Sequence, residues 1–270
     1  MNIKVTRGTV KISRNGNNEM DWFRFGAGEK IFVMLPGLSV KSLVNSAEGI
    51  ASAYRIFSDD FTVYFFDRTK FLSENYTLEQ LAGDTAEAMT ALGIKDACVF
   101  GTSQGGMIAQ IIAINHPELV SKLFLASTCA RIFPEAEKVM NEWVSLAERG
   151  DIDGFCDCFI DLLYGKSFAE KFGELIRLAH SDVTGNDFKR FVILGRSCDG
   201  FDIRDRLSSI RCPVMVVGAE NDRVLTAQAS VEIGEIIGCG CYLYGPEYGH
   251  CVFDEAPDYK DRIFKFFSEV

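Results

Sequence analysis

Ser103 lies in a glycine-rich segment whose spacing could present a serine hydroxyl to a substrate. The segment Gly101–Gly106 reads GTSQGG, with an apolar run before it at 97–100 and another after it at 107–113. A serine between glycines at a strand-to-helix junction takes a sparsely allowed backbone conformation, and side chains in place of the glycines would collide with the strand and the helix. This context predicts a nucleophilic serine at a tight turn, whereas the same pattern elsewhere would be an ordinary loop.

Buried strands and amphipathic helices alternate on both sides of this turn. The expected strands are 3–12 and 20–25, which form a hairpin, then 30–35, 61–66, 121–127, 213–218 and 241–244, with a further strand and helix in the unit 97–115. The other expected helices are 43–57, 78–92, 226–237 and 257–268. The order predicts an α/β fold, with a mostly parallel sheet flanked by helices.

Residues 131–206 interrupt this alternation and are expected to form several amphipathic helices. The segment carries aromatic residues that include Trp143, Phe159 and Phe168. We therefore expect a core built from 1–130 and 207–270, with 131–206 inserted as a helical cap over the substrate pocket. The three aromatic side chains are candidates for the wall of that pocket. The alternative is that the inserted helices only shield the sheet.

Composition and charge limit the function classes. The chain has 270 residues, of which 47% are hydrophobic, enough to bury a large core. Its net charge of −10 leaves no basic patch for nucleic acid and disfavours an anionic membrane surface. No apolar stretch reaches the ~18 residues of a membrane span, and the N-terminus lacks the apolar core of a secretion signal. We expect a cytoplasmic protein that acts on a small molecule, with no prediction of its oligomeric state.

The nine cysteines do not predict a metal site or a disulfide framework. An odd number of cysteines spread through apolar segments is typical of reduced thiols. Two C-x-C pairs occur, at 156–158 and 239–241, but the C-x₂₋₄-C spacing of zinc sites is missing. Cys239 and Cys241 are expected to lie on one face of a strand. No metal is predicted, and no other cofactor, because the glycine-rich segment lacks the Lys-Ser/Thr ending of a phosphate-binding loop.

The chain resembles the α/β-hydrolase fold family, and in particular its members with a serine nucleophile and a helical cap. In that family an acid follows a late strand and a histidine precedes the last helix. Segment 218–224 reads GAENDRV and segment 248–253 reads YGHCVF, and both resemble the family's acid and histidine turns. The resemblance implies a catalytic triad of Ser103, Asp222 and His250, in which the imidazole takes the serine proton and the carboxylate orients the imidazole.

Two alternatives to these assignments are present in the sequence. Glu220 competes for the role of the acid, and we favour Asp222 because the family's acid usually precedes a short apolar stretch. His116 lies at the end of the helix after Ser103, and His180 lies within the expected cap. Both are interpreted as structural histidines, since a histidine at a helix C-terminus commonly has a dipole or packing role.

The resemblance also implies two backbone donors for an oxyanion hole, the N–H groups of Leu38 and Gln104. Pro36 departs from the family pattern, because many relatives have histidine before the following glycine. The pair Asp67-Arg68, expected just after a strand, resembles a recurring family pair and is interpreted as structural rather than catalytic.

The resulting prediction is a serine hydrolase that cleaves an ester, thioester or related carbonyl substrate with an apolar portion through an acyl-enzyme. Amide cleavage, carbon–carbon hydrolysis, lactonase and acyl-transfer chemistry remain open, because the same fold and triad support them. The second hypothesis is a small-ligand-binding protein that keeps the pocket and hydrolyses slowly or not at all.

Overall fold

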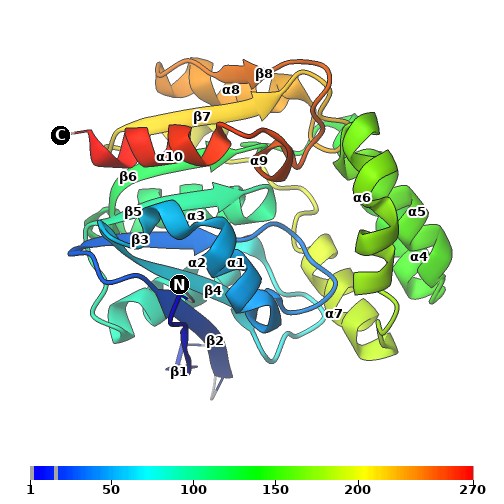
Figure 1. The fold of residues 1–270 in the computed structure, drawn as a ribbon, viewed down its shortest axis with the longest axis horizontal. Helices are drawn as coiled ribbons and strands as arrows, with labels where there is room; N and C mark the ends of the chain where they lie inside the picture. The colour runs from blue at the N-terminus through cyan, green and yellow to red at the C-terminus, as the bar shows by residue number, and fades with distance from the viewer. Residues whose placement is uncertain (1–2, 15–17, 270) are drawn as a thin grey trace.

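A computed structural model describes residues 3–14 and 18–269, which form one eight-stranded sheet covered by helices (Figure 1). The strand order is β1-β2-β4-β3-β5-β6-β7-β8. The strands are β1 (Thr6–Ile12), β2 (Asn18–Phe25), β3 (Lys30–Leu35), β4 (Phe61–Thr69), β5 (Ala97–Thr102), β6 (Val120–Ala126), β7 (Val214–Ala219) and β8 (Tyr242–Tyr244). The β1–β2 and β2–β4 pairs are antiparallel and the others are parallel, which confirms the predicted mostly parallel sheet.

Helices cover both faces of the sheet. They are α1 (Ala47–Ala53), α2 (Leu78–Ala91), α3 (Gln104–Asn115), α8 (Ala227–Ile237), α9 (Val252–Glu255) and α10 (Tyr259–Ser268). Helix α2 begins at Thr77 with a capping box that includes Gln80, and this satisfies backbone donors that the first turn of a helix leaves free. In Figure 1, α1 and α10 lie in front of the sheet, and α2, α3 and α8 lie behind it.

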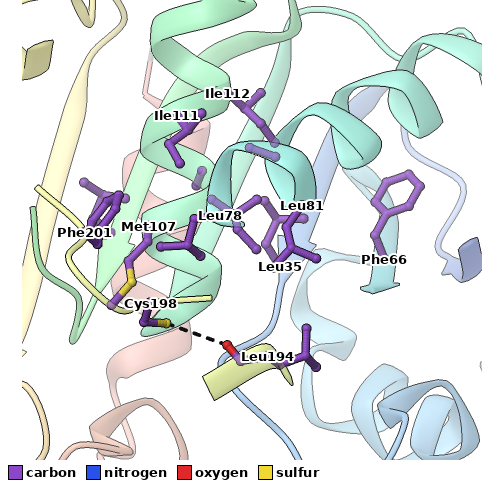
Figure 2. Close-up of a cluster of buried hydrophobic side chains, with 14 of the residues drawn as sticks. Leu35, Phe66, Leu78, Leu81, Met107, Ile111, Ile112, Leu194, Cys198 and Phe201 are labelled. Carbon is purple, nitrogen blue, oxygen red and sulfur yellow. Dashed lines mark hydrogen bonds between the residues drawn. The ribbon is translucent and has the colours of Figure 1, made fainter. Parts of the chain in front are cut away.

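The two faces bury separate hydrophobic clusters. One cluster joins the sheet to α2, α3 and α8, and the other joins it to α1 and α10. Along β5, Val99 belongs to the first cluster and its neighbours Cys98 and Phe100 to the second, as the two-residue period of a strand requires. Figure 2 shows part of the first cluster, where Met107 of α3 lies near Cys198.

Four helices lie between β6 and β7 in the chain: α4 (Pro134–Glu148), α5 (Ile152–Leu163), α6 (Lys166–Ala179) and α7 (Gly185–Arg196). They gather beyond the end of the sheet toward which the parallel strands point (Figure 1). A bridge between Arg131 and Asp202 joins the two ends of this segment. The carboxyl ends of β3, β5 and β7 therefore face these four helices.

Some local expectations are wrong. The helix expected over 43–57 is broken into a 3₁₀ turn (Leu43–Ser46), α1 and a second 3₁₀ turn (Arg55–Phe57). Asp67 and Arg68 lie inside β4, which extends beyond the predicted end. Cys239 and Cys241 precede β8 instead of sharing one of its faces, because left-handed glycines on either side of Cys239 turn the chain. None of the helices in the described part of the chain is long and apolar enough to cross a membrane.

Candidate active site

Ser103 occupies a strained turn between β5 and α3. Its φ of +51° and ψ of −123° lie in a region that residues with a side chain rarely adopt, at a cost of about 1–3 kcal/mol. Two hydrogen bonds hold the turn: Ser103 N–H donates to Ala126 O at 2.9 Å, and Thr128 Oγ1 donates to Ser103 O at 2.7 Å. Neighbouring β6 and the loop after it therefore keep the serine in this conformation.

The flanking glycines are required by close backbone approach. A Cβ on Gly101 would lie 2.6 Å from Gly105 O, and a Cβ on Gly105 would lie 2.1 Å from Leu35 O. Both distances are far below a normal van der Waals contact. The first clash is with helix α3 and the second with strand β3, so the sequence argument for these glycines is confirmed.

His250 and Asp222 form a buried pair. Their side chains are joined by His250 Nδ1 and Asp222 Oδ2 at 2.9 Å, and both residues are almost inaccessible to solvent. The other carboxylate oxygen, Oδ1, accepts from Val224 N–H and Leu225 N–H, each at 2.9 Å. Burial acts to raise the pKa of Asp222, but the imidazole and the two N–H donors hold it below its usual range.

The loop that carries His250 is attached to the end of α5. Cys251 N–H donates to Leu163 O at 2.8 Å. The carboxylate of Glu255 accepts from Gly249 N–H and from Gly165 N–H, each at 2.9 Å. These contacts fix the histidine loop against the inserted helices.

Two backbone N–H groups near Ser103 have no hydrogen-bond partner within the described residues. One belongs to Leu38, in the loop after β3, and the other to Gln104, the first residue of α3. The first N–H groups of a helix have no intrahelical acceptor, and they favour negative charge. Gly37, next to Leu38, packs against Ser103: a Cβ on it would lie 3.2 Å from Ser103 Cβ.

A buried polar network supports the segments that carry these N–H groups. The Arg68 guanidinium donates to Gln104 Oε1 (Nε at 3.3 Å, Nη2 at 3.2 Å) and to Pro36 O at 2.6 Å. Gln104 Nε2 in turn donates to Leu194 O at 2.7 Å, near the end of α7. Burial lowers the pKa of Arg68 to about 10, which leaves the guanidinium charged at neutral pH. Arg68 thus joins the loop after β3 to the Ser103 turn, and Gln104 joins both to α7.

A second contact attaches α7 to the same region. Arg190 Nη2 donates to the buried carboxylate of Asp67 at 2.8 Å, and its Nη1 lies 3.5 Å from Ser39 O. Asp67 and Arg68 are adjacent in β4, so Asp67 contacts α7 directly and Arg68 contacts it through Gln104.

Ser103 and His250 open onto one cavity of about 630 Å³. Leu38 and Gln104 also line it, and most of its wall is apolar. Of the three aromatic residues predicted for the pocket, Trp143 and Phe159 line the cavity and their rings are 4.9 Å apart. Phe168, on α6, is not part of the wall: its ring stacks on Tyr164 at 4.9 Å and contacts Phe172.

The competing residues lie elsewhere or have other contacts. Glu220 is exposed at the end of β7, and its backbone N–H pairs with Tyr244 O. His116 lies 3.6 Å from Glu118 at the end of α3. His180 ends α6, where its Nδ1 is 2.8 Å from Ile176 O, and it reaches the rim of the cavity, which the sequence did not predict. Among the described residues, no three His, Cys, Asp or Glu side chains gather as a metal site would require.

Three features of the site were missed by sequence reasoning. The side chain of Gln104 forms part of the network, whereas the sequence argument used only its N–H. Arg190 contacts the strand pair, and Asp254 lines the cavity from a helix, α9, that was not predicted. A signal existed for Asp254 alone: it follows His250 by four residues, so a short helix after the histidine would turn it toward the same space.

Known proteins resemble this chain in sequence. The model of the alpha/beta hydrolase family matches residues 32–259. A protein of Rhizobium rhizogenes named "Putative carbamate hydrolase RutD" is 26% identical over 196 residues, which cover 70% of this chain and 73% of that protein.

Solved structures share the fold. The enol-lactonase from Burkholderia xenovorans has a TM-score of 0.83 at 18% identity, covering 97% of this chain and 100% of its own. A thermophilic esterase from Thermogutta terrifontis has a TM-score of 0.79 at 19% identity, covering 97% and 98%. The family model spans most of the chain, and the protein is therefore a hydrolase that belongs to the alpha/beta hydrolase family.

Proposed function

We propose that the protein is a serine hydrolase that cleaves an ester, thioester or related carbonyl substrate through an acyl-enzyme. Ser103 is the nucleophile, His250 the general base and Asp222 the acid that orients it. The observation that carries this proposal is the shared cavity. Ser103, in the strained turn, and His250 both line it, and His250 Nδ1 is paired with the buried carboxylate of Asp222.

The proposed reaction has two halves. In the first, Ser103 Oγ attacks the carbonyl carbon while His250 takes the hydroxyl proton, and the imidazole then returns that proton to the leaving group as the carbon–leaving-group bond breaks. In the second, a water molecule attacks the acyl-enzyme with the same proton path and releases the acid. Asp222 favours both halves, because its carboxylate stabilises the imidazolium that forms in each.

The N–H groups of Leu38 and Gln104 are the proposed oxyanion hole. Each tetrahedral intermediate carries a negative oxygen, and two unpaired backbone donors beside the serine would stabilise it. Pro36, which departs from the family pattern, leaves the Leu38 N–H free, and its own carbonyl accepts a hydrogen bond from Arg68. The Arg68–Gln104 network supports this assignment, since it restrains both segments at once.

Residues 131–206 are the proposed cap, and 1–130 with 207–270 the core. Helices α4 and α5 supply Trp143 and Phe159 to the cavity wall, which suits a substrate with an apolar portion. The partner is thus a small molecule. A cytoplasmic location belongs to the same proposal and is supported by the cysteines, all nine of which are free thiols.

Labelling with a fluorophosphonate probe tests the proposal. The probe reacts with a serine only when a neighbouring base activates it. We expect one adduct, located on Ser103 by mass spectrometry, and loss of labelling in Ser103→Ala and His250→Ala. Failure of the folded wild-type protein to react would contradict the proposal and favour a protein that binds a ligand without cleaving it.

A further inference from the structure

Asp254 is an acidic side chain on the wall of the cavity that the proposed reaction does not use. It lies on α9, four residues after His250, and lines the same cavity as Ser103. Tyr54 and Ser46 line the cavity as well. A carboxylate on a mostly apolar cavity wall can bind a group of opposite charge on a ligand.

No group of the protein pairs with this carboxylate. Asp254 forms no side-chain hydrogen bond and no ion pair with any described residue. The cation that acts on it electrostatically is Lys260, whose Nζ donates to Phe253 O at 3.1 Å and lies 5.4 Å from the centre of the Tyr54 ring. Lys260 therefore attracts the carboxylate from a distance without contacting it, and the carboxylate oxygens stay available to a ligand.

The charge of Asp254 depends on its surroundings. Asp254 is exposed to solvent and lines the cavity. Desolvation by the protein atoms around it raises its pKa to about 6; Lys260 opposes the shift, and neighbouring Glu255 adds to it. Tyr54, Tyr164 and Cys251 also lie near, and burial raises the pKa of each, so they remain neutral. Above about pH 6 the carboxylate is thus an anion that forms no hydrogen bond or ion pair with any described residue.

We propose that Asp254 binds a protonated amine of the substrate, so that the Ser103 centre prefers amino esters with a cationic end and an apolar remainder. The inference rests on the proposed function and specifies its substrate class. A bond between an ammonium group and a carboxylate is stronger than one between neutral groups, and strongest where water is partly excluded. The net charge of −10 adds to the attraction of a cationic substrate and disfavours an anionic one.

Pairs of esters that differ only in charge provide the test. In one pair the alcohol portion of a butyrate ester is 2-(dimethylamino)ethyl or its neutral isostere 3-methylbutyl. In the other pair the acyl portion carries the same change, as 4-(dimethylamino)butyrate or 5-methylhexanoate. We expect the wild type to favour the cationic member of at least one pair roughly 10-fold to 100-fold in kcat/KM, the range of a charge-assisted hydrogen bond. No preference in either pair would overturn the proposal.

Asp254→Asn should bring the preferred ratio close to one, since the amide keeps the size of the side chain and removes its charge. Asp261→Asn is the matched control: it removes one charge from an exposed position on α10 that does not line the cavity, and the ratio should stay as in the wild type. A ratio that is unchanged in Asp254→Asn would contradict the assignment.

The pH dependence of the ratio in the wild type gives a second measurement that needs no variant. The ratio should rise with pH through about 6 as Asp254 ionises, because changes in the shared catalytic machinery affect both esters alike and cancel in the ratio. A flat ratio would count against Asp254.

Binding measurements distinguish a failure of this inference from a failure of the proposed function. Calorimetry with Ser103→Ala measures the affinity for each ester without cleavage. If the wild type cleaves none of these esters and does not react with the fluorophosphonate, the proposed function is contradicted. Tighter binding of the cationic ester would still support the Asp254 site, and equal binding would overturn it.

Discussion

The guanidinium of Arg68 and the side-chain carbonyl of Gln104 form a buried hydrogen-bonded pair next to the Ser103 turn, with Nη2 and Oε1 3.2 Å apart. Arg68 also donates to Pro36 O, and Gln104 also donates to Leu194 O. The pair thus links three chain segments that are distant in sequence: the loop after β3, the start of α3 and the end of α7. Figure 2 shows Leu194 and Cys198 from the last of these segments beside Met107 of α3.

This relationship predicts a loss of turnover when the pair is broken. Arg68→Lys keeps a charge but removes the planar fork that reaches Pro36 and Gln104 together. We expect kcat on a small activated ester to fall about 10-fold to 100-fold with KM changed much less. Displaced N–H donors of the proposed oxyanion hole would stabilise the transition state less, and they would affect binding of the substrate less strongly. Arg206→Lys, on the surface beside Glu79, is the control and should keep wild-type kinetics. A rise in KM alone would show that Arg68 acts on substrate binding instead.

The proposed triad should behave as a unit. Ser103→Ala and His250→Ala should each lower kcat by roughly 10³-fold or more, and the double variant should be hardly worse than either single one. Additive losses would contradict a shared step. Asp222→Asn should be severe, because it disturbs the tautomer and charge of His250. Glu220→Gln changes an exposed carboxylate and should have little effect.

Gly105 offers a test of how closely α3 packs on β3. In Gly105→Ala the new Cβ would lie 2.1 Å from Leu35 O and 2.4 Å from Pro36 O, so the backbone must move, and we expect a loss of about 1–3 kcal/mol in the free energy of unfolding. Gly49→Ala is the matched control in helix α1, where nothing lies within 4 Å of the new Cβ. That change should raise stability by about 0.5–1 kcal/mol, since alanine is the better helix former. Urea denaturation of both variants gives the comparison.

Much of this arrangement could be predicted from the sequence because it depends on local patterns. The period of apolar residues indicated the strands and α2, and the GTSQGG spacing indicated the turn at Ser103. The Arg68–Gln104 pair could not be found in this way, since its partners come from β4, α3 and α7 and meet only when the sheet is assembled. Phe168 failed as a pocket residue for a related reason: periodicity marks the apolar side of a helix but does not say which neighbour that side contacts.

The raised pKa of Asp254 predicts a pH-dependent stability. Its pKa is about 6 in the folded protein and about 4 in an unfolded chain. Between these values the folded state holds more protons than the unfolded state, so the contribution of Asp254 to stability falls as pH rises through this window and is constant above it. Asp254→Asn should therefore melt at a higher temperature than the wild type at about pH 8, and the difference should shrink toward about pH 5. Asp261→Asn should show no such trend, and an equal difference at both pH values would count against a raised pKa.

Substitutions of the aromatic residues in the inserted helices test whether these helices select substrates or only cover the sheet. Trp143 and Phe159 face the cavity, whereas Phe168 stacks between Tyr164 and Phe172. Trp143→Leu and Phe159→Leu should alter the ranking of ester chain lengths in kcat/KM, because the acyl or alcohol chain contacts this wall. Small activated esters barely reach the wall, so their kcat should stay within about tenfold of the wild type. Phe168→Leu is the matched control and should keep the wild-type ranking. If neither cavity-facing change moves the ranking in variants that still fold, residues 131–206 would be a cover for the sheet and the substrate would lie elsewhere in the cavity.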